Sequence, residues 1–131
     1  MQEPQSLENL LDTPQKKLSF YQNLILLAVA DGQLEESESN FLISIGNRLG
    51  ISAQEAMSIA ENLDKLSFII PEEGIQKTLE LQTMVLMMLE DGQIHPREQA
   101  LCREYTRRIG YSQELLDEMI TELSGNKAGG Q

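Results

Sequence analysis

The chain contains an internal duplication, and this feature limits its fold more than any other. Residues Leu24–Leu63 align with Met84–Leu123 without a gap, at a constant separation of 60 positions. The motif Asp31-Gly32-Gln33 falls on Asp91-Gly92-Gln93, and many apolar positions coincide as well. Two copies are too few for a solenoid, which needs about three or more. The duplication therefore predicts a single domain over residues 1–131, built from two pseudo-symmetric repeats at about 14–66 and 71–123.

Helix start and stop signals divide each repeat into three helices. Thr13 precedes a proline, Ser52 and Glu55 form a capping box, and Gly32, Gly50 and Gly110 stand where helices should end. The expected helices are Pro14–Asp31, Glu36–Leu49 and 52–66, then Pro71–Asp91, Pro96–Gly110 and Ser112–Leu123, with a short extra helix near Ser6–Leu11. No segment alternates with period two. The prediction is an all-α, compact bundle of six to seven helices.

Charge and composition narrow the possible partners. The chain has 131 residues and a formal net charge of −11, which phosphate backbones would repel. Its arginines at 97, 103, 107 and 108 are interleaved with Glu98 and Glu104, as on a solvated helix face. Nucleic acid is therefore not an expected partner.

Cysteine use and hydropathy indicate a cytoplasmic protein. Cys102 is the only cysteine, so no intrachain disulfide can form, and its apolar helical position predicts a place in the core. The uninterrupted apolar runs Leu24–Ala30 and Met84–Leu89 are far shorter than the roughly 20 residues of a membrane span. The N-terminus has no basic signal region. The small, glycine-rich stretch at 124–131 is expected to be a disordered tail.

The repeated D-G-Q-[LI]-x-x-x-E motif matches the second half of a calcium-binding EF-hand loop. A complete loop also needs oxygen ligands at its first and third positions. In this chain those positions are Leu27 and Val29 in the first copy, and Met87 and Leu89 in the second. None of these side chains carries an oxygen, so a complete EF-hand is excluded in both copies.

Two interpretations of the motif remain open. In the structural one, the glycine ends a helix and Glu38 or Glu98 occupies the third position of the next helix, where the helix dipole favours a carboxylate. Asp31 and Asp91 fit this interpretation less well, because a negative charge at a helix C-terminus costs about 0.3–1 kcal/mol. In the second interpretation, these aspartates bind a cation or another ligand.

No catalytic or structural-metal pattern is present elsewhere. His95 is the only histidine, and with Asp91 and Glu98 it could join a carboxylate-rich cation site. One histidine and one cysteine argue against structural zinc. The sequence has no glycine-rich phosphate loop and no nucleophile set, so enzymatic chemistry is not indicated.

The pattern a-x-A-D-G-x-[IL]-x-x-x-E after a buried helix resembles the TerB-like family, whose namesake is linked to tellurite resistance. The resemblance extends over about Pro14 to Leu123. The residues that carry it are Ala28, Ala30, Asp31, Gly32, Leu34, Glu38 and Leu49–Ser52 in the first copy, and Glu90, Asp91, Gly92, Ile94, Glu98, Ile109 and Gly110 in the second.

The resemblance implies an all-α fold of six or seven helices and a role in stress-response or metal-linked complexes. It also implies divalent-cation binding (Ca²⁺, Mg²⁺, Mn²⁺ or Zn²⁺) through acidic residues. It does not imply enzymatic activity. Transferred to this chain, the acidic positions are Asp31, Glu35 and Glu38 in one copy and Asp91 and Glu98 in the other. His95-Pro96 interrupts the second acidic run, so the two sites are expected to be unequal. Tellurite, an oxyanion, does not suit so acidic a chain.

The leading expectation is a non-catalytic interaction module that binds a protein partner and a divalent cation. One alternative is a metal-dependent enzyme with a carboxylate-lined site, which requires Asp31, Glu38, Asp91, His95 or Glu98 to converge. Another is a purely structural or dimerising protein. The sequence leaves open whether the chain is a monomer or a homodimer, and whether a partner brings it to a membrane surface.

Overall fold

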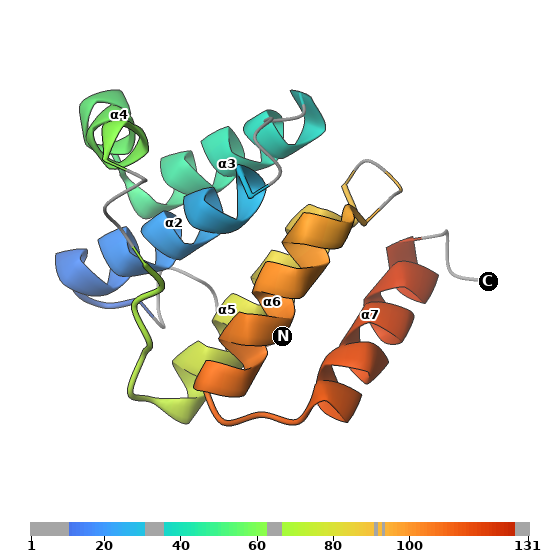
Figure 1. The fold of residues 1–131 in the computed structure, drawn as a ribbon. Coiled ribbons are helices and arrows are strands. Elements are labelled where there is room, and N and C mark those ends of the chain that lie inside the picture. The colour runs from blue at the N-terminus through green and yellow to red at the C-terminus, as the bar shows by residue number, and fades with distance from the viewer. Residues whose placement is uncertain (1–10, 31–35, 63–66, 91, 93, 128–131) are drawn as a thin grey trace, which may run out of the picture.

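The computed structural model describes residues 11–30, 36–62, 67–90, 92 and 94–127 of the chain. Its helices, in order, are α2 (Pro14–Ala28), α3 (Glu36–Leu49), α4 (Ala53–Glu61), α5 (Gly74–Met88), α6 (Pro96–Arg108) and α7 (Gln113–Lys127). No strand occurs in these described ranges, which confirms the all-α prediction. The first three helices lie on one side of the molecule and the last three on the other (Figure 1). The short helix expected near 6–11 falls outside the described residues, apart from Leu11.

The helices begin where local chemistry predicts them. Thr13 caps α2, since its hydroxyl accepts a hydrogen bond from the Lys16 amide at 3.1 Å. The Ser52–Glu55 capping box is present in both directions at the start of α4. The Ser112 hydroxyl accepts from the Leu115 amide at 3.1 Å and caps α7. Helices α5, α6 and α7 each begin 60 positions after α2, α3 and α4, which matches the offset of the duplication.

Several predicted helix boundaries are wrong, among them the end of α6, which falls at Arg108 rather than Gly110. Helix α2 ends at Ala28 rather than Asp31, because the Ala30 amide turns back to the Leu27 carbonyl in a tightened last turn. Helix α5 ends at Met88 rather than Asp91, and it begins at Gly74 rather than Pro71. Asn23 of α2 binds both backbone groups of Ile69, two residues before Pro71, and fixes the segment that leads into this helix.

The third helix of each repeat also differs from its expected length. Helix α4 ends at Glu61 with Asn62 as its C-cap, and 63–66 lie outside the described residues. Helix α7 instead continues to Lys127, past the predicted end at Leu123 and into the expected tail. The Ser-Gly-Asn-Lys stretch contains no proline, so nothing in it blocks backbone hydrogen bonding.

The core is formed by the apolar ends of α2 and α5, as the sequence predicts. Leu24 and Leu27 of α2 and Met84, Met87 and Met88 of α5 are fully buried. The two helices pack on each other and both contact α6. Among the helices that the structure describes, none combines the length and the apolar composition needed to cross a lipid bilayer.

The two repeats pack their third helices differently. Helix α7 packs against both α5 and α6, and its Leu116 and Met119 are buried. Helix α4 packs mainly on α2, and none of its residues is buried. In Figure 1, α4 stands at the edge of the molecule beyond α2 and α3. The first repeat is therefore the more open half.

Gly110 offers a test of the predicted helix stops. Its φ of 87° lies in the left-handed region, and an added Cβ would meet nothing within 4 Å. Gly110→Ala should therefore lower the free energy of unfolding by about 1–2 kcal/mol through backbone strain alone. Gly125, inside α7 with equally open surroundings, is the matched control: Gly125→Ala should raise stability by up to ~1 kcal/mol. Urea unfolding of both variants measures the two changes in the free energy of unfolding. Changes of the same sign in the two variants would contradict this account.

Candidate functional site

The residues predicted to bind a cation are only partly described. Asp31, Glu35 and Asp91 lie outside the described residues. Glu38 and Glu98 are each the third residue of a helix, α3 and α6, and both side chains are buried. The structural interpretation of the motif predicts this helix position, where the positive end of the dipole stabilises a carboxylate.

His95 occupies the predicted N-cap position of α6, but its side chain makes no capping hydrogen bond. Within the described part of the chain, no three His, Cys, Asp or Glu side chains form a group that could hold a metal ion. The proposed set depends on Asp31, Glu35 and Asp91, so cation binding stays a prediction.

A buried polar network, absent from the sequence-based interpretation, lies at the centre of the molecule. The Glu80 side chain of α5 is 1% exposed and accepts three hydrogen bonds. Asn23 of α2 donates to Oε1 at 2.9 Å, and the Tyr105 hydroxyl of α6 donates to the same oxygen at 2.8 Å. Gln76, one turn earlier on α5, donates to Oε2 at 2.7 Å. One carboxyl group thus joins three helices.

The network also fixes the chain that leads into α5. The Asn23 amide donates to the Ile69 carbonyl at 2.9 Å and accepts from the Ile69 amide at 2.9 Å. The Phe68 ring packs edge-on against Tyr105, with ring centroids 5.1 Å apart. Asn23 therefore satisfies both backbone groups of Ile69 and the Glu80 carboxyl at once.

Burial sets the electrostatics of this network. Loss of water raises the pKa of Glu80, although its hydrogen bonds from Asn23, Gln76 and Tyr105 oppose that shift. The pKa of Tyr105 is raised by burial and by the neighbouring Glu80 carboxylate, so this phenol keeps its proton. Burial also raises the pKa of Cys102 to about 12. Cys102 is fully buried, as predicted, and it remains a thiol at neutral pH.

The sequence carried a signal for this network. Gln76, Glu80 and Thr83 recur at helical spacing on the stripe of α5 that also contains Met84 and Met87. A glutamate on an otherwise apolar stripe needs partners, because burying an unpaired charge is costly. The partners come from α2 and α6, and their identity depends on tertiary packing that the local pattern does not reveal.

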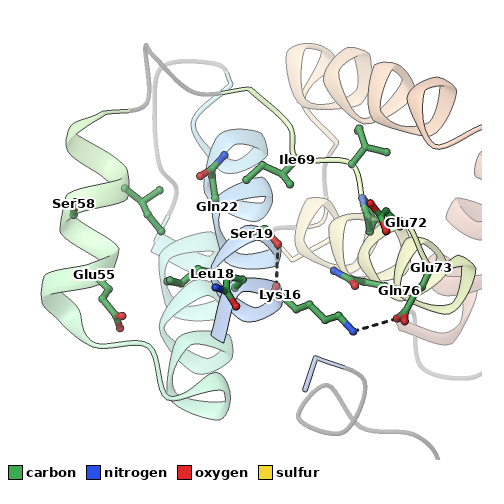
Figure 2. Close-up of a pocket in the computed structure, with 14 residues that line it drawn as sticks. Lys16, Leu18, Ser19, Gln22, Glu55, Ser58, Ile69, Glu72, Glu73 and Gln76 are labelled. Carbon is green, nitrogen blue, oxygen red and sulfur yellow. Dashed lines mark hydrogen bonds and ion pairs between the residues drawn. The ribbon is translucent and has the colours of Figure 1, made fainter. Parts of the chain in front are cut away.

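A groove of about 670 Å³ opens beside this network, between α2, α4 and the segment that leads into α5 (Figure 2). Lys16 spans its lower edge through ion pairs to Asp12 at 3.1 Å and Glu73 at 3.4 Å. The hydrogen bond to Asp12 raises the pKa of Lys16 and lowers that of the aspartate. The groove is lined by Gln15, Lys16, Leu18, Ser19, Gln22, Glu55, Ser58, Ile59, Ile69, Ile70, Pro71, Glu72, Glu73 and Gln76.

Gln76 connects this groove to the interior. Its side chain lines the groove and also donates to Glu80, so the buried carboxyl lies one hydrogen bond behind the groove surface. Gln22, on the α2 wall, donates to the Ser67 carbonyl at 3.0 Å and holds the opposite rim in place. The groove therefore has walls that are fixed by side-chain to backbone bonds.

A second groove, of about 450 Å³, lies on the other side of α4, against α3 and α2. No charged residue lines it. Ile43 and Met57 stand at its rim and are 57% and 60% exposed. Its lining consists of Tyr21, Ile25, Val29, Ser39, Leu42, Ile43, Gly46, Asn47, Ile51, Ser52, Ala53, Ala56, Met57 and Ala60. We call it the α3–α4 groove, and the groove beside Gln76 the α2–α4 groove.

Fold and site together define the class: a small, acidic, all-helical bundle with a buried carboxyl network and a groove on each side of α4. Searches against family models, curated proteins and solved structures found no match to this chain.

The Glu80 carboxyl should make stability depend on pH. Its pKa is raised above the ordinary value of 4.5 in the folded protein, so between these two values the folded state binds more protons than the unfolded state. Stability from this group is fully present below pH 4.5 and is lost as the pH rises through the folded pKa. Glu80→Gln keeps the shape but does not titrate, so the variant should gain stability relative to wild type as the pH rises from 4.5 to neutrality. Denaturant unfolding at several pH values measures the difference, and a constant difference would contradict the shift.

Asn23 and its neighbour Gln22 form a matched pair for testing the network. Asn23→Ala leaves the Ile69 amide, the Ile69 carbonyl and Glu80 each short of a buried partner, which should cost about 3 kcal/mol or more. Gln22→Ala removes a single hydrogen bond, to the Ser67 carbonyl, which is exposed to solvent. Its loss should lower the free energy of unfolding by at most about 1 kcal/mol. Thermal and urea unfolding compare the two variants. Similar losses would show that the network does not organise the fold.

Proposed function

We propose that this chain is a non-catalytic, TerB-like helical domain that acts as a protein-interaction module in the cytoplasm, in a stress or metal-response context. The observation that supports the proposal is the pair of grooves that flank α4. Together they give this edge of the molecule two concave surfaces with fixed walls, whose linings are rich in apolar side chains. Concave, mostly apolar surfaces with a few polar groups are typical binding sites.

In this proposal the buried titratable groups of the core have a structural role. The Glu80 carboxyl and the Tyr105 hydroxyl bind each other in the interior, and the Cys102 thiol is buried beside them in the same core. The α3–α4 groove presents amides, hydroxyls and aliphatic side chains, and the α2–α4 groove adds the charged side chains of Lys16, Glu55, Glu72 and Glu73. The metal-dependent enzyme alternative requires Asp31 and Asp91, which lie outside the described residues, to converge with Glu38, His95 or Glu98.

Site-specific photo-crosslinking in cells tests this function. A benzoylphenylalanine would replace Met57 at the rim of the α3–α4 groove, or Glu72 at the rim of the α2–α4 groove. Ile75 is the control, since it is 63% exposed and lines neither groove. An interaction module should give discrete heavier adducts from position 57 or 72 and none from 75. Adducts of equal yield at all three positions, or at none, would contradict the proposal.

A further inference from the structure

The α3–α4 groove exists because the two copies of the duplication fill equivalent positions differently. Ala56 and Ala60 of α4 occupy the positions that Leu116 and Ile120 occupy in α7, 60 residues later. Leu116 is fully buried against the second repeat, and Ile120 packs on the same core. Ala56 and Ala60 both line the groove. The first repeat therefore lacks two large aliphatic side chains, four residues apart, that close the second one.

The rim of the groove also differs between the two repeats. In the second repeat, Arg103 of α6 donates to Asp117 of α7 at 3.0 Å and to Gln113 at 3.1 Å, and this joins the two helices. The equivalent positions in the first repeat are Ile43 of α3 and Met57 of α4. Both are exposed, so the first repeat presents two large apolar side chains to solvent where the second has an ion pair.

The floor of the groove is rigid. Tyr21 of α2 donates a hydrogen bond to the Leu42 carbonyl of α3 at 3.0 Å. Gly46 permits this close approach, since a Cβ there would lie 3.1 Å from the Tyr21 hydroxyl oxygen. A partner would meet a preformed surface, which reduces the ordering cost of binding.

The shape of the groove fits a helix. On α3 the lining residues recur at Ser39, Leu42, Ile43, Gly46 and Asn47, which is one helical stripe about two turns long. On α4 they recur at 53, 56, 57 and 60, another stripe of similar length. An amphipathic helix that lays its apolar face between such stripes is a common recognition mode.

The charge around the groove selects the partner. Of the four glutamates in the segment 36–61, Glu38 is buried and Glu55 lines the α2–α4 groove, so Glu36 and Glu61 are the two that a partner at the α3–α4 groove could meet. Glu36 and Glu61 are exposed and lie on the same helix faces as the lining residues Ser39 and Met57, at spacings of three and four. Basic residues beside an apolar stripe would complement this rim. A second copy of the chain, which also carries a net charge of −11, would be repelled.

We propose that the α3–α4 groove binds a basic amphipathic helix of a partner protein, whose leucine- or isoleucine-sized side chains, four residues apart, fill the space left by Ala56 and Ala60. This inference rests on the proposed interaction function and names the chemistry of its partner. The partner helix takes the place of the side chains that α7 supplies for itself in the second repeat.

A model peptide provides the direct test. The probe is fluorescent acetyl-KALKKALKALKKALK-amide, about four helical turns long, with its leucines on one stripe. The control peptide has alanine in place of every leucine and keeps the same charge. Fluorescence anisotropy with the full chain should show at least tenfold tighter binding of the leucine peptide. Equal binding of the two peptides, or no binding of either, would overturn the proposal.

Groove-filling variants assign the site. The double variant Ala56→Leu with Ala60→Ile takes its residues from the second repeat, so it should keep or raise the melting temperature while weakening peptide binding at least tenfold. The control is Ala100→Leu, an exposed alanine of α6 that lines neither groove, and it should bind within twofold of wild type. Unchanged binding by the double variant would overturn the proposal.

Two further outcomes separate this inference from the function on which it rests. Sedimentation of wild type as a dimer that the double variant dissociates would assign the groove to a second copy and overturn the basic-helix proposal. Crosslinked adducts at position 57 or 72, together with failure of the peptide to bind, would keep the interaction function and reject this partner. If neither crosslinked adducts nor peptide binding is observed, both the interaction function and the basic-helix proposal are rejected.

Discussion

The hydrogen bonds to the Glu80 carboxyl connect parts of the chain that no local interaction could place together. They join α2 through Asn23, α6 through Tyr105 and the backbone at Ile69 through the same asparagine. A buried ionic group seldom adds stability over well-packed apolar residues of similar size. Its contribution here is geometric, because the three donors Asn23, Gln76 and Tyr105 reach the carboxyl together only when α2, α5 and α6 are packed on one another.

The two copies of the repeated sequence pattern differ at the centre of this network. Position 80 corresponds to Phe20 in the first repeat, which is fully buried without any polar partner. The second repeat thus holds the polar centre and a closed third helix, α7. The first repeat has an apolar residue at that position, contributes the buried Asn23 to the same network, and has an open third helix, α4. The two repeats have the same order of helices, and they differ because residues at a few equivalent positions have diverged.

Local signals in the sequence predicted much of this fold. Thr13, Ser52 and Ser112 begin helices because a capping hydroxyl acts within three residues, and glycines such as Gly50 end them for equally local reasons. The bonds that fix the segment before α5 were not predicted, because Asn23 lies 46 positions away from Ile69. The grooves were not predicted for a similar reason. Ala56 is an ordinary helix-forming residue in the sequence, and its place in a groove depends on how α4 packs.

The open half carries an energetic consequence. Fully burying a leucine side chain contributes about 1.5–3 kcal/mol. Helix α7 has this contribution at Leu116 and part of it at Ile120, and α4 has alanine at both equivalent positions. Helix α4 is short and packs mainly on α2, so tertiary contacts must supply most of its stability. A partner that fills the α3–α4 groove would restore the missing contacts and stabilise α4 in the same step. Binding at this groove and the local stability of the first repeat are therefore coupled, since any ligand of the folded state shifts that equilibrium toward it.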